Sequence, residues 1–171
     1  MKIELKKIKL NLEFSEETLM YRADIYIDGY HAGYCENDGR GGCTSYHWLD
    51  QRGKDLIIKA QDYVELMPEK NYGDFKYKLR LQDYLDDLVN DHLRKKEEKQ
   101  WIKKIEKMSQ NGIVLGNDIE YVHIKFKYSL ADLCEHRPLD IKRKVQEALD
   151  KYKDRNYRLL NTNIPYDILT T

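Results

Sequence analysis

An alternating pattern that runs directly into a tight turn constrains the fold of this chain more than any other feature. Five apolar residues alternate with polar ones along one segment: Leu19, Tyr21, Ala23, Ile25 and Ile27. Alternation with a period of two is typical of a strand that buries one face. Asp28-Gly29 follows at once, and both residues tolerate the positive φ angles of a two-residue hairpin turn. The pattern predicts a β-hairpin in which Ile27 faces Tyr30, Ile25 faces Ala32 and Ala23 faces Tyr34.

Further elements follow from the spacing of apolar residues and from turn and cap signals. We expect an earlier strand with a break at Lys6-Lys7, a loop over 36–47, a helix over 51–67, a strand over 75–81, a long helix over 83–111, a hairpin over 113–128, helices beginning near 129 and 138, and a last strand over 157–160. This order predicts an α+β fold: a mostly antiparallel sheet built from hairpins, packed against two main helices, with a long charged helix in the middle of the chain. At 171 residues, we assign 1–171 to a single α+β domain.

The charge balance and the short apolar runs argue against a nucleic-acid partner and a membrane partner. Lys plus Arg equals Asp plus Glu at 30 each, whereas a protein that holds duplex nucleic acid usually has a basic excess, so a nucleic-acid partner is less favoured. No apolar run approaches the roughly 20 residues that span a bilayer, so we expect no membrane partner.

Three scattered cysteines indicate reduced thiols and a cytoplasmic protein. The carboxylates Asp86, Asp87 and Asp91 fit an exposed flank of the long helix and receive no role.

A glycine-rich segment after the hairpin is the main candidate for a functional loop. Three of the nine glycines fall within four positions, at 39, 41 and 42. Glycines at this density allow several backbone N–H groups to converge on one anion. A tight structural connection would also explain them, and both interpretations stay open. The candidate residues for binding a ligand or partner are Asp38, Gly39, Arg40, Gly41, Gly42, Cys43, Thr44, Tyr46 and His47.

Cysteine and histidine residues around this segment raise two further possibilities. His31, Cys35, Cys43 and His47 have a metal-ligating composition, but not the spacing of a structural zinc module. On a regular strand, His31 and Cys35 would lie about 13 Å apart, too far to share one ion. We therefore expect no metal and no cofactor. Cys43 and His47, oriented by Asp38, provide the residue types of a nucleophile and its base, which makes a small hydrolase the alternative to a binding protein.

Four segments of the chain form a recognisable set: the strand pair Y-I-D-G-Y-H-A-G-Y at 26–34, the loop motif N-D-G-x-G-G-C-T at 37–44, the segment P-x-x-x-Y-G at 68–73 before a long charged helix, and L-N-T-N at 160–163. In these segments the chain resembles small hypothetical proteins that bacteriophages and bacterial mobile elements encode. The resemblance implies a small phage-type protein that acts against a host defence system in the bacterial cytoplasm. It carries no catalytic residues over to this chain.

Together these observations favour a non-enzymatic binding protein of phage or mobile-element type. It would use the glycine-rich loop and nearby tyrosines to grip a protein partner or a small phosphorylated ligand. A homo-oligomer is possible.

Overall fold

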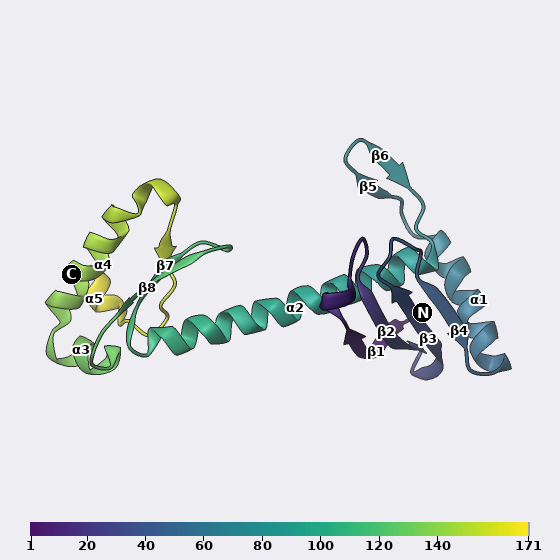
Figure 1. The fold of residues 1–171 in the computed structure, drawn as a ribbon, viewed down its shortest axis with the longest axis horizontal. Helices are drawn as coiled ribbons and strands as arrows, with labels where there is room; N and C mark the ends of the chain where they lie inside the picture. Colours follow the sequence, from purple (N-terminus) through teal and green to yellow (C-terminus); the bar gives the residue numbers. More distant parts are fainter. Residues whose placement is uncertain (171) are drawn as a thin grey trace. The chain divides into compact units, whose positions relative to one another are not determined.

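The computed structural model describes residues 1–170, except for the side chain of Tyr72. It divides into two compact units, Met1–Lys95 and Lys96–Thr171 (Figure 1). All strand pairs are antiparallel, and strands and helices are both abundant, which confirms the α+β fold.

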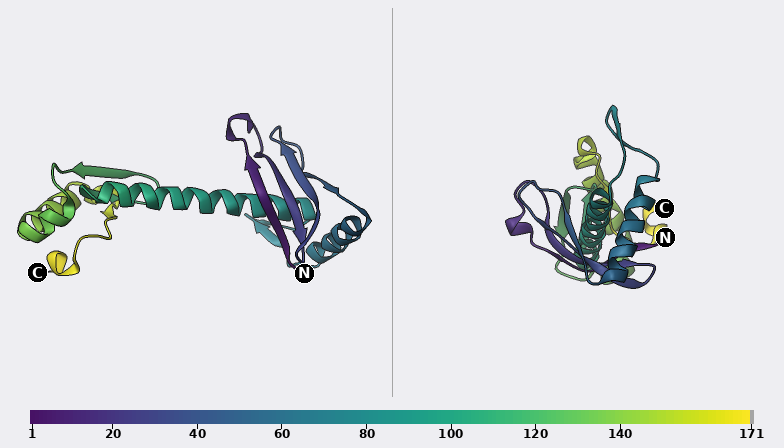
Figure 2. Two further views of the ribbon diagram at one scale, coloured as in Figure 1. Left: turned by 90° about the horizontal axis from the view of Figure 1, so that it is seen from below. Right: turned by 90° about the vertical axis from the view of Figure 1, so that its right-hand side faces the viewer.

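The first unit is built on a four-stranded sheet in the order β1-β2-β3-β4. The strands are β1 (Ile3–Leu10), β2 (Met20–Ile27), β3 (Tyr30–Asp38) and β4 (Ser45–Trp48), with the short 3-10 helix η1 (Leu12–Phe14) between β1 and β2. Helices α1 (Gln51–Glu65) and α2 (Leu81–Ser109) contribute to the same hydrophobic cluster as the inner face of this sheet. Figure 2 shows the strands lying across the first turns of α2. The opposite face of the sheet is therefore left open.

The predicted hairpin forms, with one change of register. Asp28 and Gly29 both have positive φ angles, 47° and 83°, and Ile27 pairs with Tyr30. Beyond Tyr26 and His31 the register shifts, so that Ile25 pairs with Gly33 and Ala23 with Cys35. The predicted pairs Ile25–Ala32 and Ala23–Tyr34 are wrong, because Ala32 is the extra residue of a β-bulge.

The bulge decides which residues of β3 face the helices. A shift of one residue exchanges the two faces of a strand. Cys35 and Asn37 consequently point inward and are buried, whereas Tyr34 and Glu36 lie on the open face. A second irregularity in β1, between Lys6 and Lys9, includes a positive φ at Lys7 and confirms the predicted break.

The glycine-rich segment is shorter than the expected loop over 36–47. β3 continues to Asp38, and β4 returns from Ser45 to pair with it. Only residues 39–44 connect the two strands. Asp50 then caps α1 by accepting a 2.6 Å hydrogen bond from the amide of Gly53.

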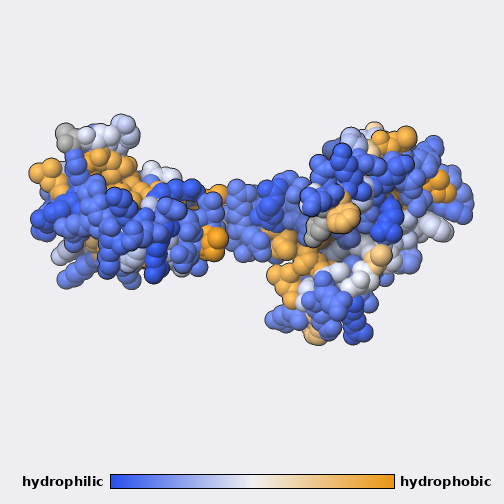
Figure 3. All heavy atoms as spheres, turned by 90° about the horizontal axis from the view of Figure 1, so that it is seen from above, coloured by the Kyte–Doolittle hydropathy of each residue, from blue (hydrophilic) through white to orange (hydrophobic). Residues whose placement is uncertain are grey.

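The predicted strand over 75–81 is also shorter than expected. β6 (Phe75–Tyr77) pairs with β5 (Lys70–Tyr72) in a small hairpin, and Leu79 and Leu81 are buried in the core of the first unit. Helix α2 begins at Leu81 and has 29 residues. Its middle, residues 94–100, is exposed throughout, and Figure 3 shows a hydrophilic surface along it.

The second unit contains a three-stranded sheet in the order β8-β7-β9. The strands are β7 (Gly112–Gly116), β8 (Tyr121–Lys125) and β9 (Arg158–Leu159), and the helices are α3 (Leu130–His136), α4 (Pro138–Lys151) and α5 (Tyr166–Thr170), with the 3-10 helix η2 (Lys153–Arg155) after α4. Ser129 caps α3 by accepting a 3.1 Å hydrogen bond from the amide of Asp132, which agrees with the helix predicted to begin near 129. A separate hydrophobic cluster fills this unit.

Two units stand where the sequence analysis assigns one domain over 1–171. The core of the first unit ends at Val89, and the core of the second begins at Ile113. The exposed run 94–100, Arg-Lys-Lys-Glu-Glu-Lys-Gln, contains no apolar side chain that would continue either core. This run gives the physical reason for the division.

Candidate functional site

The glycine-rich loop is held by hydrogen bonds within the first unit. Gly39 and Gly41 have φ angles of +82° and +86°, which glycine adopts without strain. The prediction is that several backbone N–H groups of the loop could converge on an anion, and three of these groups already donate to side-chain oxygens. Gly39 N donates to Asn37 Oδ1 (2.9 Å), Arg40 N to Asp38 Oδ1 (3.1 Å) and Gly41 N to Thr18 Oγ1 (3.3 Å). A phosphate bound by this backbone would have to displace those acceptors.

The carbonyl of Gly39 forms a second attachment. It accepts hydrogen bonds from the amides of Glu16, Glu17 and Thr18, at 2.9, 3.0 and 3.3 Å. A Cβ at position 39 would lie 2.7 Å from the backbone oxygen of Phe14. Glycine is therefore required at position 39 by both its φ angle and the close approach of this neighbouring turn.

Asn37 is the centre of the hydrogen bonds that hold the loop. Its side chain is buried at 6% exposure. Both lone pairs of its Oδ1 and both N–H groups of its Nδ2 take part in hydrogen bonds. Oδ1 accepts from the hydroxyl of Thr18 (2.8 Å) and from the amide of Gly39. Nδ2 donates to the carbonyl of Gly42 (3.0 Å) and to Thr44 Oγ1 (3.2 Å). One side chain thus connects both ends of the loop.

A carboxylate on α2 completes this network. Asp86 Oδ1 accepts from the hydroxyls of Tyr21 (2.9 Å) and Thr44 (2.5 Å), which themselves lie 3.0 Å apart. The sequence analysis assigns Asp86 to an exposed flank without a role, and that assignment is wrong. The residue lies on the side of α2 that faces the sheet, where two buried hydroxyl groups need an acceptor.

Burial controls the ionisation of the groups beneath the loop. It raises the pKa of the Tyr21 hydroxyl far above its usual value, so this tyrosine stays a neutral donor. Burial likewise raises the pKa of the Cys35 thiol to about 12, although a hydrogen bond with Tyr21 partly opposes the change. Cys35 is therefore an unreactive thiol at neutral pH.

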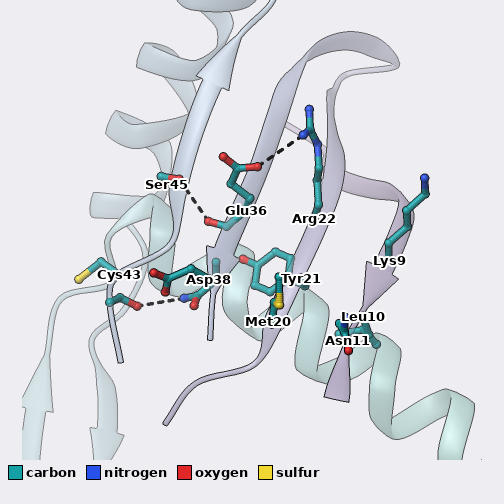
Figure 4. A pocket seen from close by; sticks show the side chains of 12 residues that line it. Lys9, Leu10, Asn11, Met20, Tyr21, Arg22, Glu36, Asp38, Cys43 and Ser45 are labelled. Carbon is teal, nitrogen blue, oxygen red and sulfur yellow. Dashed lines mark hydrogen bonds and ion pairs between the residues drawn. The ribbon is translucent and has the colours of Figure 1, made fainter. Parts of the chain in front are cut away.

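A pocket of about 620 Å³ opens beside the loop, where β1, β2, β3 and β4 present one end of the open face. Its lining is Lys9, Leu10, Asn11, Met20, Tyr21, Arg22, Glu36, Asn37, Asp38, Gly42, Cys43 and Ser45. Figure 4 shows Lys9, Arg22, Glu36 and Ser45 side by side on successive strands. Arg22 and Glu36 form an ion pair of 3.6 Å.

Two pairs of stacked aromatic rings lie on the open face of the sheet, outside this pocket. Tyr26 stacks on His31 with centroids 4.8 Å apart, and Tyr34 stacks on His47 at 4.9 Å. A cation covers each tyrosine: Lys6 lies 4.0 Å from the ring of Tyr26, and Arg22 lies 4.3 Å from that of Tyr34. These contacts order the side chains of the face.

The structure brings together only part of the predicted site. Asp38, Gly42 and Cys43 line the pocket, and Arg40 is exposed on the loop. Thr44 is buried within the network beneath the loop. Gly39 and Gly41 shape the backbone. Tyr46 turns toward α1, where its hydroxyl accepts a 2.6 Å hydrogen bond from Gln61.

The side chains proposed for a hydrolase have other neighbours. His47 stacks on Tyr34 and lies 4.0 Å from a carboxylate oxygen of Glu36. Cys43 is exposed, and its thiol contributes, after Asp83, to raising the pKa of Arg80. Within residues 1–170, no hydrogen bond or ion pair joins His47 to Cys43 or to Asp38.

The possible metal ligands are also separated. Cys35 points into the core while Cys43 is exposed, and His31 and His47 belong to different ring stacks. In the part of the chain that the structure describes, no group of three or more potential ligands could hold a metal ion.

Four residues of the site and its supporting network are not predicted from the sequence: Thr18, Tyr21, Arg22 and Asp86. Tyr21 was placed on the buried face, and a buried hydroxyl group requires a hydrogen-bond partner, which was the available signal. Its partner Asp86 lies 65 positions away and cannot be found from local spacing.

Among the helices of residues 1–170, none combines the length and the apolar character that crossing a bilayer requires. No protein-family model, curated protein or solved structure matches the chain.

Proposed function

We propose that this chain is a non-enzymatic binding protein that grips a segment of a partner protein in the pocket beside the glycine-rich loop. The observation that carries the proposal is the loop itself. Asn37 and the Gly39 carbonyl hold it in place, and it forms one wall of a pocket of about 620 Å³. A wall fixed before binding lowers the entropy cost of recognition.

The lining favours a protein segment over a small phosphorylated ligand. Two cations, Lys9 and Arg22, are balanced by two carboxylates, Glu36 and Asp38. The balanced charge therefore selects no anion, and the amides of Gly39, Arg40 and Gly41 are already occupied, which makes the loop backbone a less favourable anion site. Apolar atoms of Leu10 and Met20 lie among these polar groups, a mixture suited to a peptide.

A hydrolase has less support from the same geometry. Its general base would be His47, whose ring is stacked on Tyr34 and next to Glu36. The exposed thiol of Cys43 in the pocket nevertheless gives this alternative a direct test by chemical labelling.

The biological context of the proposal comes from the resemblance to phage and mobile-element proteins. On that basis the partner would belong to a host defence system in the bacterial cytoplasm. A nucleic-acid partner is less favoured because of the balanced charge.

The test is a variant that fills the pocket without disturbing the loop. Gly42 lines the pocket, and a Cβ there would meet only Asp38 Oδ1, at 3.8 Å. Gly42→Val should therefore fold normally. The matched control is Gln100→Val, which adds the same side chain at an exposed position of α2.

Partners captured from bacterial cells are purified and their affinities measured by calorimetry. We expect Gly42→Val to weaken binding at least about tenfold, the cost of a steric block in a well-packed interface, and Gln100→Val to bind like the unmodified protein. A folded Gly42→Val protein with unchanged affinity would show that the pocket is not the binding site.

A further inference from the structure

A second, smaller pocket is also lined by Tyr21 and Asn37. Its volume is about 280 Å³, and its lining is Thr18, Leu19, Tyr21, Asn37, Asp86, Val89 and Asn90. All of these residues belong to the first unit. The two pockets share Tyr21 and Asn37, so they lie next to the same hydrogen-bond network.

The charge in this second pocket is uncompensated. Asp86 accepts hydrogen bonds from two hydroxyl groups, Tyr21 and Thr44, both through Oδ1. The tyrosine remains protonated because burial raises its pKa, so both groups are neutral donors. Within the described part of the chain, no Lys, Arg or His nitrogen forms an ion pair with this carboxylate.

Position 86 differs in this respect from its acidic neighbours on α2. Asp83 pairs with Arg80, Asp87 with Lys70 and Asp91 with Arg94. A half-buried carboxylate that holds only neutral donors attracts a cation, because the attraction between opposite charges is stronger where water is partly excluded.

The remaining walls of the pocket define the shape of that cation. Leu19 supplies the accessible apolar surface, since Val89 also lines the pocket but is fully buried, and Asn90 supplies an amide at an exposed position of the lining. Apolar walls with a carboxylate and an amide suit an aliphatic stem that ends in a charged nitrogen group. Lysine and arginine side chains have this construction.

We propose that the second pocket binds the ammonium or guanidinium group of a lysine or arginine side chain of the partner, with Asp86 as its counter-ion. The proposal rests on the proposed function, in that the cationic side chain belongs to the segment held in the first pocket. The shared Tyr21 and Asn37 then place the two subsites within reach of one segment.

The test uses the isolated, ¹⁵N-labelled full chain and requires no partner. N-acetyl-arginine amide and N-acetyl-lysine amide are titrated while NMR follows the amide signals of Thr18, Leu19 and Asn90. We expect saturable shifts at these positions and none with N-acetyl-glutamine amide, a neutral probe of similar length. Equal shifts with the glutamine probe would overturn the proposal, because they would show that charge is not recognised.

Three variants separate charge from shape. Asp86→Asn keeps an oxygen that accepts from both hydroxyls but removes the charge, and we expect affinity for the arginine probe to fall about tenfold. Asp91→Asn, the control, removes an exposed charge from the same helix and should change nothing. Asn90→Trp keeps the charge of Asp86 and blocks the pocket, so it should abolish binding.

The outcomes are decisive in both directions. Unchanged binding by Asp86→Asn or by a folded Asn90→Trp refutes the site, and Asn90→Trp still decides the matter if Asp86→Asn fails to fold. Putrescine serves as a further probe. If putrescine binds and the two capped amino acids do not, the pocket binds free amines, and the proposal that it binds a lysine or arginine side chain is refuted. Because Gly42→Val tests the first pocket alone, failure of either proposal is recognised without reference to the other.

Discussion

Replacing Asn37 by alanine should destabilise the first unit strongly, although the residue is only one position from the end of β3. The change removes four hydrogen bonds, two accepted by Oδ1 and two donated by Nδ2. A typical intramolecular hydrogen bond contributes about 1 kcal/mol. Two of the abandoned partners, Gly39 and Thr44, are themselves buried, so water cannot fully replace the amide. We expect Asn37→Ala to lower the free energy of unfolding by about 3 kcal/mol.

The assay exploits the two tryptophans of the chain, Trp48 in the first unit and Trp101 in the second. In a Trp101→Phe background, urea unfolding followed by fluorescence reports on the first unit. Asn90→Ala, at an exposed asparagine of α2, serves as the control and should stay within about 0.5 kcal/mol of the parent. A loss below about 1 kcal/mol for Asn37→Ala, the worth of a single hydrogen bond, would refute our account of the loop.

A double-mutant cycle tests the network more closely. Thr44→Val removes the hydroxyl that receives one hydrogen bond from Asn37. Because the two side chains share that bond, the double variant should cost less than the sum of the single variants. Strict additivity would mean that Asn37 and Thr44 act independently, contrary to the geometry.

Three further outcomes follow from the first unit. Gly39→Ala should destabilise by about 2 kcal/mol or more, from its positive φ and its crowded Cβ position. Gly42→Ala should be neutral in the same urea assay, and equal losses at both positions would contradict this distinction. Iodoacetamide at neutral pH should label Cys43 in the native protein and leave Cys35 unmodified, as read by peptide mass spectrometry, because burial raises the pKa of Cys35 to about 12. Labelling of Cys43 no faster than a free peptide thiol would count against the hydrolase. Hydrogen bonds from Tyr30 and the Gly53 amide lower the folded-state pKa of Asp50. Its stabilising contribution is therefore present at neutral pH and lost as the pH falls through that lowered value, so Asp50→Asn should flatten the acid side of the stability–pH curve.

Local chemistry made much of the fold predictable. The turn at Asp28-Gly29 needs only residues that accept positive φ, and the helix starts at the Ser129 cap and at Pro138, in the first turn of α4, depend on their immediate neighbours. The bulge at Ala32 was different. Ala32 is small enough to fit a regular pairing of β2 with β3 as well as a bulge. The bulge is favoured because it turns Cys35 and Asn37 to the buried face of the sheet, whose core includes helices that come later in the chain.

The candidate site was predictable only as a location. Glycine density identified the loop, but its anchoring partners are spread over the chain: Thr18 precedes the hairpin, and Asp86 lies on a helix after it. Hydrogen bonds between such distant residues depend on the tertiary fold. For that reason the sequence alone suggested free amides, whereas in the structure the amides of Gly39, Arg40 and Gly41 are occupied.

The Gly39 carbonyl, held by three amides of the preceding turn, has a consequence for how specificity could change during evolution. Fixing one residue of backbone costs about 1–2 kcal/mol in conformational entropy, and here folding has already met that cost for the loop. Substitutions at the exposed side chains of Arg40 and Cys43 therefore act on a surface whose backbone is already set. On the proposed function, substitutions at these two positions would change which partner is bound while the residues that build the loop stay unchanged.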